Sequence, residues 1–342
     1  MNAQLSGQRL NATPKMPRLG FLGVGWIGRQ RMQVLADNGV ATVAAIADAQ
    51  PEAARAAANY VPHARIAEDL AELLAHEDLD GLVIATPSGA HATQATMALE
   101  RGIAVFCQKP LTRTADEAEQ VLAAARRADR LLDVDFSYRC VSGVALLRDL
   151  VQSDELGDLY AIDLTFHNAY GPDKPWFYDL SQSGGGCVMD LGIHLVDLAM
   201  WISGSGGHQE LVSTLYSQGR PLQRPVQAVE DYATAQWRLD NGASVRLACS
   251  WRLPAGQDAV IEAAFYGTRG GAALRNVGGS FYDFTVDRFD GTTRQRLADP
   301  PDAWGGRMLV QWAHQLSLDP RFDTRAEHLL GVARTVDAIY GR

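Results

Sequence analysis

Short apolar and β-branched runs alternate with longer segments rich in Ala, Leu, Glu and Arg in the first part of the chain. The runs predict strands at 18–22, 42–47, 81–85, 103–106 and 131–136. The segments between them predict helices at 26–38, 51–60, 68–76, 90–101 and 114–129. Such an alternation is typical of a parallel sheet with crossover helices. We therefore expect a doubly wound α/β domain over residues 18–137, after a polar tail of residues 1–17.

The pattern changes after residue 138. A helix is expected near 142–152, a strand at 157–167 and a helix at 189–203. Strands then dominate, and they are expected in the runs LVSTLYSQ, DYATAQWRL, ASVRLACSW, AVIEAAFYG and FYDFTVDRF. Turn signals such as Gly270-Gly271 separate these runs, and helices close the chain at 305–317 and 324–340. Residues 138–342 are thus expected to form a second α/β domain with a mainly antiparallel sheet, which the family resemblance described below implies to be large and open.

Composition and charge narrow the class of protein. The 342 residues are 47% hydrophobic and 21% charged, which is ordinary for a globular protein of two domains. A net charge of -9 disfavours binding to nucleic acid or to an anionic membrane, so a small molecule is the expected partner. We expect no membrane span, because Asp190, His194 and Asp197 interrupt the longest apolar stretch. The N-terminal residues lack the apolar core of a secretory signal, so a cytoplasmic location is expected.

A glycine-rich motif follows the first predicted strand. Gly23, Gly25 and Gly28 form GxGxxG, with Trp26 and Ile27 at its variable positions. The first glycine permits a tight turn, the second lets a pyrophosphate approach the backbone, and the third lets the helix pack on the strand. The start of the following helix carries partial positive charge for the phosphates. In this context the motif predicts dinucleotide binding.

Asp48 closes the second predicted strand, 20 residues after Gly28. Its carboxylate can accept hydrogen bonds from ribose hydroxyls and would repel a 2′-phosphate, and residues 49–51 offer no Arg or Lys to neutralise one. We therefore expect NAD in preference to NADP. The alternatives are that Asp48 is only a solvated turn residue, and that Arg55 reaches a phosphate.

Two further segments lie where strands of the predicted sheet end. Thr86 and Pro87 follow one strand, and Gln108-Lys109-Pro110 follows the next. Ligands bind at the carboxyl ends of strands in open α/β sheets, so Lys109 is placed to meet a substrate. A solvated loop lysine is the alternative interpretation.

In the second domain, Asp190, His194 and Asp197 follow the triplet Gly184-Gly185-Gly186 and recur at helical spacing. A polar stripe on an otherwise apolar helix must face either a partner network or a cleft, because burying unpaired polar groups costs free energy. The alternative is a buried His–Asp structural pair. One histidine with flanking acids does not complete a metal site, and the four cysteines form no CxxC pair, so we expect reduced thiols and no metal.

Taken in order, GxGxxG, the Gln-Lys-Pro segment and the GGG…DxGxHxxD segment resemble the glucose-fructose oxidoreductase and inositol dehydrogenase (Gfo/Idh/MocA) family. Thr86 to His91 is similar to its TPNxxH segment, and Phe136 to Arg139 to the segment that opens its second domain. The resemblance implies a Rossmann domain, a substrate cleft between the two domains, and a homodimer or homotetramer formed through the open sheet. It also implies cofactor contacts in the strand-end segments, namely Thr86, Pro87, His91, Gln108 and Lys109.

By the same resemblance Lys109, Asp190 and His194 match the catalytic lysine and the DxxxH pair of the family. The family pattern is usually Glu-Lys-Pro, so Gln108 is a departure, and Lys109 should hold its proton less tightly than beside a glutamate. The implied reaction passes a hydride between nicotinamide and a secondary alcohol of a sugar or cyclitol, and either His194 or Lys109 can be the base. Neutral polyols are weakly favoured over phosphorylated sugars. Alternatives are a redox-neutral lyase, hydrolase or epimerase of the same fold, and a non-catalytic sensor of nucleotide or sugar.

Substrate contacts are expected from the catalytic cluster, from the start of the second domain and from the loop before the glycine triplet. The candidates are Lys109, Tyr138, Arg139, His167, Asn168, Lys174, Trp176, Tyr178, Asp190 and His194. For Trp176 a packing role is an equal alternative, and Trp251 is assigned to the core or an interface.

Overall fold

The computed structural model describes residues 15–75 and 78–342, so residues 1–14 of the predicted polar tail lie outside it. In the described part a parallel sheet has the strand order β3-β2-β1-β4-β5-β6. Its strands are β1 (Arg18–Leu22), β2 (Thr42–Ala47), β3 (Arg65–Ile66), β4 (Gly81–Ile84), β5 (Ala104–Cys107) and β6 (Leu132–Val134). Every residue of β4 and β5 is buried, as expected for central strands covered on both faces. The order reverses between β1 and β4, which is where nucleotides bind in doubly wound folds.

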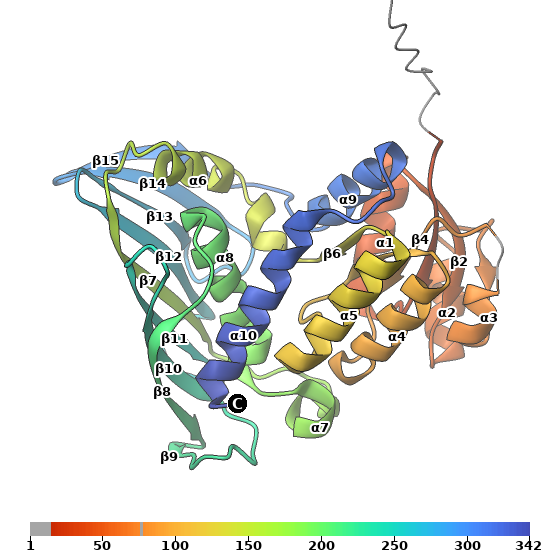
Figure 1. The fold of residues 1–342 in the computed structure, drawn as a ribbon, viewed down its shortest axis with the longest axis horizontal. Helices are drawn as coiled ribbons and strands as arrows, with labels where there is room; N and C mark the ends of the chain where they lie inside the picture. The colour runs from red at the N-terminus through yellow and green to blue at the C-terminus, as the bar shows by residue number, and fades with distance from the viewer. Residues whose placement is uncertain (1–14, 76–77) are drawn as a thin grey trace, which may run out of the picture.

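Helices flank this sheet as the sequence predicts (Figure 1). They are α1 (Trp26–Asn38), α2 (Pro51–Ala58), α3 (Leu70–Leu74), α4 (Ser88–Glu100) and α5 (Ala115–Ala128). Helix α3 is shorter than the predicted 68–76, whose last residue lies outside the described part. The two-residue strand β3 was not predicted, because it is too short to show a pattern.

The second sheet has the order β15-β14-β13-β12-β7-β11-β10-β8-β9 within the described residues. Its strands are β7 (Leu159–Asn168), β8 (Gln209–Ser217), β9 (Arg220–Pro221), β10 (Tyr232–Arg238), β11 (Ser244–Ser250), β12 (Ala259–Gly267), β13 (Gly271–Asn276), β14 (Phe284–Asp290) and β15 (Thr293–Ala298). Strands β7 and β11 pair in parallel and the other paired strands are antiparallel, which confirms the mainly antiparallel prediction.

Strands β13 and β15 were missed, as was the two-residue strand β9. Gly271 begins β13 instead of belonging to a turn, and the short run GAALRN lacks the β-branched residues that mark a strand. Strand β15, with the sequence TRQRLA, lies at the sheet edge and is largely exposed, so no apolar face reveals it.

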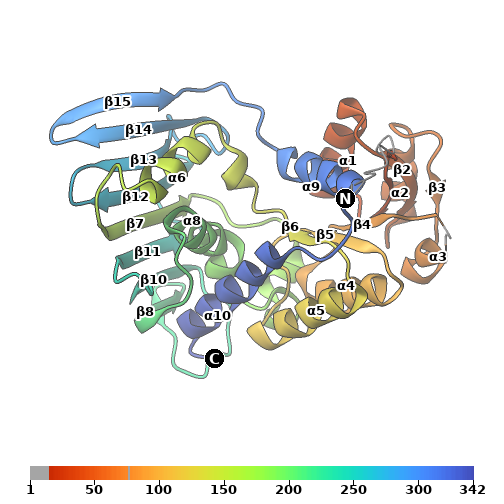
Figure 2. The ribbon, with the colours of Figure 1, turned by 45° about the horizontal axis from the view of Figure 1, so that its top comes forward.

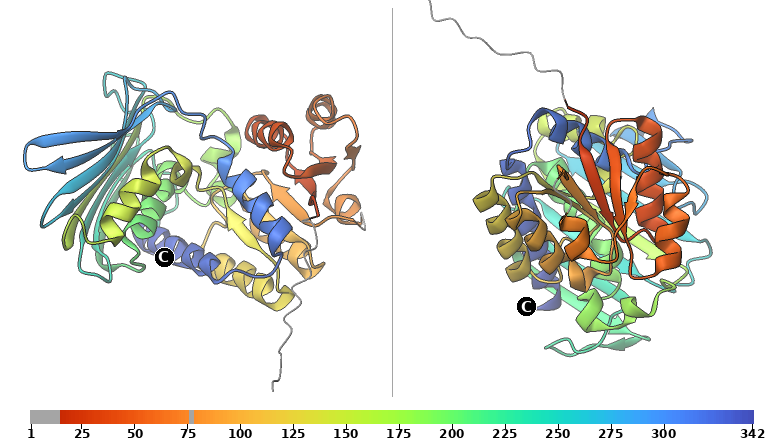
Figure 3. Two further views of the ribbon diagram at one scale, coloured as in Figure 1. Left: turned by 90° about the horizontal axis from the view of Figure 1, so that it is seen from above. Right: turned by 90° about the vertical axis from the view of Figure 1, so that its right-hand side faces the viewer.

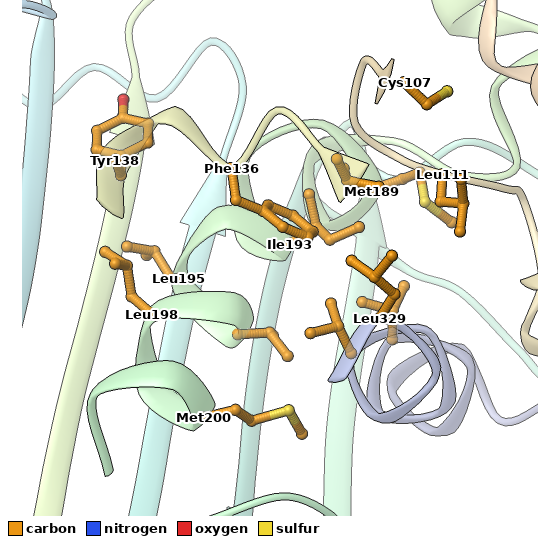
Figure 4. Close-up of a cluster of buried hydrophobic side chains, with 14 of the residues drawn as sticks. Cys107, Leu111, Phe136, Tyr138, Met189, Ile193, Leu195, Leu198, Met200 and Leu329 are labelled. Atoms are coloured by element: carbon orange, nitrogen blue, oxygen red, sulfur yellow. The ribbon is translucent and has the colours of Figure 1, made fainter. Parts of the chain in front are cut away.

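Helices α6 (Val144–Gln152), α8 (Ile193–Ser203) and α10 (His328–Tyr340) lie on one face of the second sheet, and the described elements leave its other face uncovered (Figures 1 and 2). Side chains of α8 such as Leu195 and Leu198 point toward the sheet, while Ile193 lies toward Leu329 of α10 (Figure 4). The core of this half therefore surrounds α8.

One stretch is more apolar than the sequence analysis allowed. Residues Leu180–Ser203 are helical and apolar enough to cross a membrane by length and composition. However, 89% of the most apolar window of this stretch is buried inside the structure. It runs through α7 (Leu180–Ser183), a π-helical turn (Val188–Gly192) and α8, and its burial is that of a core helix.

Helix α9 (Arg307–Leu318) returns to the parallel sheet (Figure 3). The rings of Trp312 and Phe106 lie 5.6 Å apart, and a Cβ on Gly81 would meet the Trp312 ring at 2.6 Å. The same apolar cluster includes Leu19 and Leu309. A segment near the end of the chain therefore completes the core of the N-terminal sheet.

Candidate active site

The glycine-rich loop between β1 and α1 has the geometry that its sequence predicts. Gly23 has a φ of 85°, and a Cβ there would meet the Ala85 carbonyl oxygen at 2.6 Å. A Cβ on Gly28 would meet the Gly23 carbonyl oxygen at 2.1 Å, whereas Gly25 has nothing within 4 Å. The outer glycines thus serve close packing, and the middle one leaves the backbone at the start of α1 open to a ligand. No acidic residue lies in the first turn of α1, so its partial positive charge is available to a phosphate.

Asp48 is tied to this loop and is not merely a solvated turn residue. Its Oδ2 accepts from the Val24 N–H at 2.7 Å, and its Oδ1 accepts from the Gln50 N–H at 2.8 Å. Each oxygen keeps a lone pair that a ribose hydroxyl can use. Arg55 is exposed and pairs with Glu52 at 2.7 Å. The loop and this acid fit a dinucleotide.

The segment after β4 is connected to the segment after β5 by a histidine. His91 is buried on α4, and its ring nitrogens lie 2.7 Å from the Pro110 carbonyl oxygen and 2.8 Å from the Thr86 carbonyl oxygen. Burial lowers the pKa of His91. Pro87 precedes α4 at its N-terminus. Because both ring nitrogens are occupied by backbone, His91 braces these loops, and the expected direct cofactor contact stays a prediction.

Lys109 and Asp190 come from different halves of the chain and meet at the end of β5. Lys109 Nζ donates to Asp190 Oδ1 at 2.7 Å and to the Asp190 carbonyl oxygen at 2.6 Å. Asp190 lies in the π-helical turn, a helix form frequent at functional sites. The indole Nε1 of Trp251, which follows β11, donates to Asp190 Oδ2 at 3.1 Å. Asp190 is therefore held between Lys109 and Trp251.

His194 lies one helical turn after Asp190 and is 7% exposed. Its Nδ1 is buried without a hydrogen-bond partner, and its ring packs against Tyr138 with centroids 4.9 Å apart. Burial, and then the charge of Lys109, hold the pKa of His194 well below 6.5. The imidazole is consequently neutral at physiological pH.

The third member of the predicted stripe faces away from this cluster. Asp197 is buried and forms a two-bond ion pair with Arg139, and its Oδ1 lies 2.8 Å from His328 Nε2. Arg139 also lies over the rings of Phe136 and Trp201. Arg139 and Asp197 are thus bound to each other through Nε and Nη2 of the guanidinium, and the expected substrate contact by Arg139 stays a prediction.

Among the remaining substrate candidates, Tyr138 is buried, and Trp176 and Tyr178 belong to a turn beside Trp251. The turn Pro175–Tyr178 packs on Trp251, since the rings of Phe177 and Tyr178 lie 6.2 and 5.7 Å from it. Trp176 stacks on Phe177 at 3.8 Å.

His167 and Asn168 lie at the carboxyl end of β7, an inner strand of the second sheet. His167 Nδ1 lies 2.8 Å from Ser250 Oγ, and burial lowers the pKa of His167. The Asn168 side chain accepts from the Tyr170 N–H, and Lys174 pairs with Asp173. His167 pairs with Ser250, the residue before Trp251, and the substrate contacts expected of His167, Asn168 and Lys174 stay predictions.

The glycine triplet is explained by a residue that the sequence analysis missed. Glu230 is fully buried, and its carboxylate accepts from the N–H groups of Gly186 at 2.8 Å and Val188 at 2.9 Å, and from the Tyr340 hydroxyl at 2.8 Å. Burial raises the pKa of Glu230. A Cβ on Gly185 would meet that hydroxyl at 2.0 Å. Glycine is needed in this triplet because a side chain would clash with the groups around Glu230. The buried Glu230 carboxylate can therefore cap the helical segment that carries Asp190.

No group of three or more His, Cys, Asp or Glu side chains in the described ranges is arranged to hold a metal ion. The burial expected of Trp251 is confirmed, but its hydrogen bond to Asp190 was not predicted, and Glu230 was missed altogether, because both roles depend on contacts made across the fold.

Comparison with known proteins agrees with this geometry. Residues 17–136 match a family model described as an oxidoreductase family with an NAD-binding Rossmann fold, and residues 144–273 match one described as the GFO/IDH/MocA C-terminal domain. The uncharacterized oxidoreductase YrbE of Bacillus subtilis (strain 168) is 30% identical over 75% of this chain and 73% of its own length. Inositol 2-dehydrogenase of Rhizobium meliloti (strain 1021) is 27% identical over 82% of each chain.

Among solved structures, levoglucosan dehydrogenase in complex with NADH and levoglucosan aligns with a TM-score of 0.80 and 22% identity, over 95% of this chain and 96% of that one. This similarity shows the fold. Since both halves match in the order that the sequence motifs predict, the chain belongs to the Gfo/Idh/MocA family of NAD-binding oxidoreductases.

Proposed function

We propose that this protein oxidises a secondary alcohol of a sugar or cyclitol with NAD, at the cluster of Lys109, Asp190 and His194. The observation that carries the proposal is that Asp190 holds Lys109 beside the buried, neutral His194. This cluster lies at the carboxyl end of β5, in the sheet that also bears the nucleotide loop. Relatives named inositol 2-dehydrogenase, D-apiose dehydrogenase and D-glucoside 3-dehydrogenase support the substrate class.

The geometry favours His194 as the base. A neutral imidazole can accept the hydroxyl proton of the substrate, whereas Lys109 is held in an ion pair with Asp190. Lys109 can donate a hydrogen bond to the same oxygen and stabilise the negative charge that develops on it. Asp190, fixed by Trp251, keeps the lysine in place. When bound, NAD supplies the acceptor for the hydride released from the carbinol carbon. Lys109 as the base is the alternative.

The experiment is to incubate the purified protein with NAD or NADP and a panel of cyclitols and aldoses. NADH is followed by its near-ultraviolet absorbance, and each mixture is then examined by mass spectrometry. NADH formation with one sugar class is expected. Sugar conversion without net NADH would instead indicate a redox-neutral enzyme, and bound NAD without any conversion across a broad panel would favour a sensor.

We also propose that residues 18–137 serve cofactor binding, and that residues 138–342 serve substrate binding and assembly. The uncovered sheet face supports a homodimer or homotetramer, because it carries Val212 at 66% exposure and a shallow groove beside the ion pair of Arg246 and Asp163. Val212→Asp is expected to shift the mass measured by light scattering toward the monomer, and an unchanged mass would place the interface elsewhere. A cytoplasmic location is part of the proposal and is checked by cell fractionation.

A further inference from the structure

Asp135 lies immediately beyond β6, and two donors share one oxygen of its carboxylate. Asp135 Oδ2 accepts from Arg31 Nε at 2.5 Å and from Gln108 Nε2 at 2.6 Å. The three residues are 1%, 6% and 7% exposed, respectively. This buried triad therefore contains one negative charge, one positive charge and one neutral amide.

The triad is attached to the strand that carries the active-site lysine. Gln108 directly precedes Lys109, and the Asp135 N–H donates to the Cys107 carbonyl oxygen at 2.9 Å. Asp135 thus holds the end of β5 through both its backbone and its side chain. Arg31 is also close enough to His194 to contribute to its low pKa, behind burial and Lys109 and against the opposing charge of Asp197. A change of charge beside Arg31 is therefore expected to affect both Lys109 and His194.

We propose that Asp135 is a positioning residue of the active site, which through Gln108 holds the end of β5 so that Lys109 reaches Asp190. This positioning role rests on the proposed function, because it matters for catalysis only through Lys109. Residue 108 must then be an uncharged donor, because a glutamate there would place a second carboxylate against Asp135 where Arg31 supplies a single compensating cation. The amide of Gln108 meets this requirement without changing the length of the side chain.

The position of Lys109 can be measured without any substrate, as the rate of its acetylation by dilute acetic anhydride followed by peptide mass spectrometry. Lys174, which is 62% exposed in its side chain, is the internal control. Gln108→Glu and Asp135→Asn are each expected to raise the acetylation rate of Lys109 relative to Lys174 about tenfold, because each disturbs the triad and frees the ammonium from Asp190. The double variant Gln108→Glu/Asp135→Asn restores one negative charge with donor and acceptor exchanged. It should return the ratio to within about twofold of the original, as expected for strongly coupled sites.

A third variant, which changes no charge, keeps the test valid if the other variants fail to fold. Gln108→Leu removes the amide hydrogen bond and leaves the pair of Arg31 and Asp135 in place, so it should fold, as checked by circular dichroism and by a cooperative thermal transition. It too should raise the acetylation rate of Lys109. An unchanged rate in this variant, or a double variant no closer to the original than the single ones, would overturn the positioning role. Because neither readout needs turnover, a protein that passes these tests but converts no sugar would count against the proposed function alone.

Discussion

Trp251 and Asp190 are joined by a hydrogen bond of 3.1 Å from the indole nitrogen to the carboxylate oxygen that Lys109 does not use. The carboxylate is therefore fixed at both oxygens, by a neutral donor on one side and a cation on the other. Trp251 is 3% exposed, so this donor is shielded from competing water.

Trp251→Phe is expected to lower kcat about tenfold, because loss of a hydrogen bond to a charged group releases Asp190 and with it Lys109. Trp237→Phe is the matched control, since Trp237 is equally buried but its indole nitrogen has no hydrogen-bond partner. Both variants should lose thermal stability, and steady-state kinetics should separate them. Equal kcat values in the two variants would mean that Trp251 only fills space.

His194→Ala and Lys109→Ala are each expected to lower kcat by about 10² to 10⁴, the range of general acid–base catalysis. The loss in kcat should far exceed any change in the affinity for NADH, measured by fluorescence titration, because neither side chain belongs to the nucleotide loop and Lys109 is only one of several expected cofactor contacts. His314→Ala, at an exposed position of α9, serves as the control. Turnover at the original rate in either active-site variant would exclude the proposed role of that residue.

Asp48→Ala is expected to weaken NADH binding at least about tenfold and NADPH binding much less, because the carboxylate is the group that discriminates between the ribose hydroxyl and its phosphate. Asp48 also accepts from the Val24 N–H, so some loss for both nucleotides can come from the loop. Asp48→Asn keeps an acceptor there and isolates the effect of charge. If the ratio of the two dissociation constants is unchanged in Asp48→Asn, another residue distinguishes the cofactors.

Asp133 in β6 provides a test of stability against pH. Burial raises the pKa of Asp133 to about 6, against the opposing charge of Arg139. The folded state thus binds this proton more tightly than the unfolded state, where the pKa is about 3.9, so stability falls as pH rises from about 4 to 6. Asp133→Asn should therefore stabilise the protein by about 3 kcal/mol at pH 8 and by almost nothing at pH 4. Urea unfolding at both values measures this, and a destabilised variant at pH 8 would contradict it.

The sequence was most informative where a local rule determines the outcome. The alternation of strands and helices before residue 137, the roles of Gly23 and Gly28 and the helix that carries His194 all follow from patterns within short segments. By contrast, Asp197 shares helical spacing with Asp190 but pairs with Arg139 and His328, because the π-helical turn and the surrounding elements decide which way each acid points. The same is true of Trp251, Asp135 and Glu230. Their partners come from other elements, so no local pattern could identify them.

The return of α9 to the parallel sheet has a consequence for how the protein is made. Trp312 and Leu309 cover apolar residues that include Leu19 and Phe106, which leave the ribosome long before them. Until α9 is synthesised, the nascent N-terminal half exposes this apolar surface, and exposed apolar surface promotes aggregation. The N-terminal sheet therefore completes its core only after α9 has been synthesised, and we expect the two halves of the chain to fold together instead of in succession.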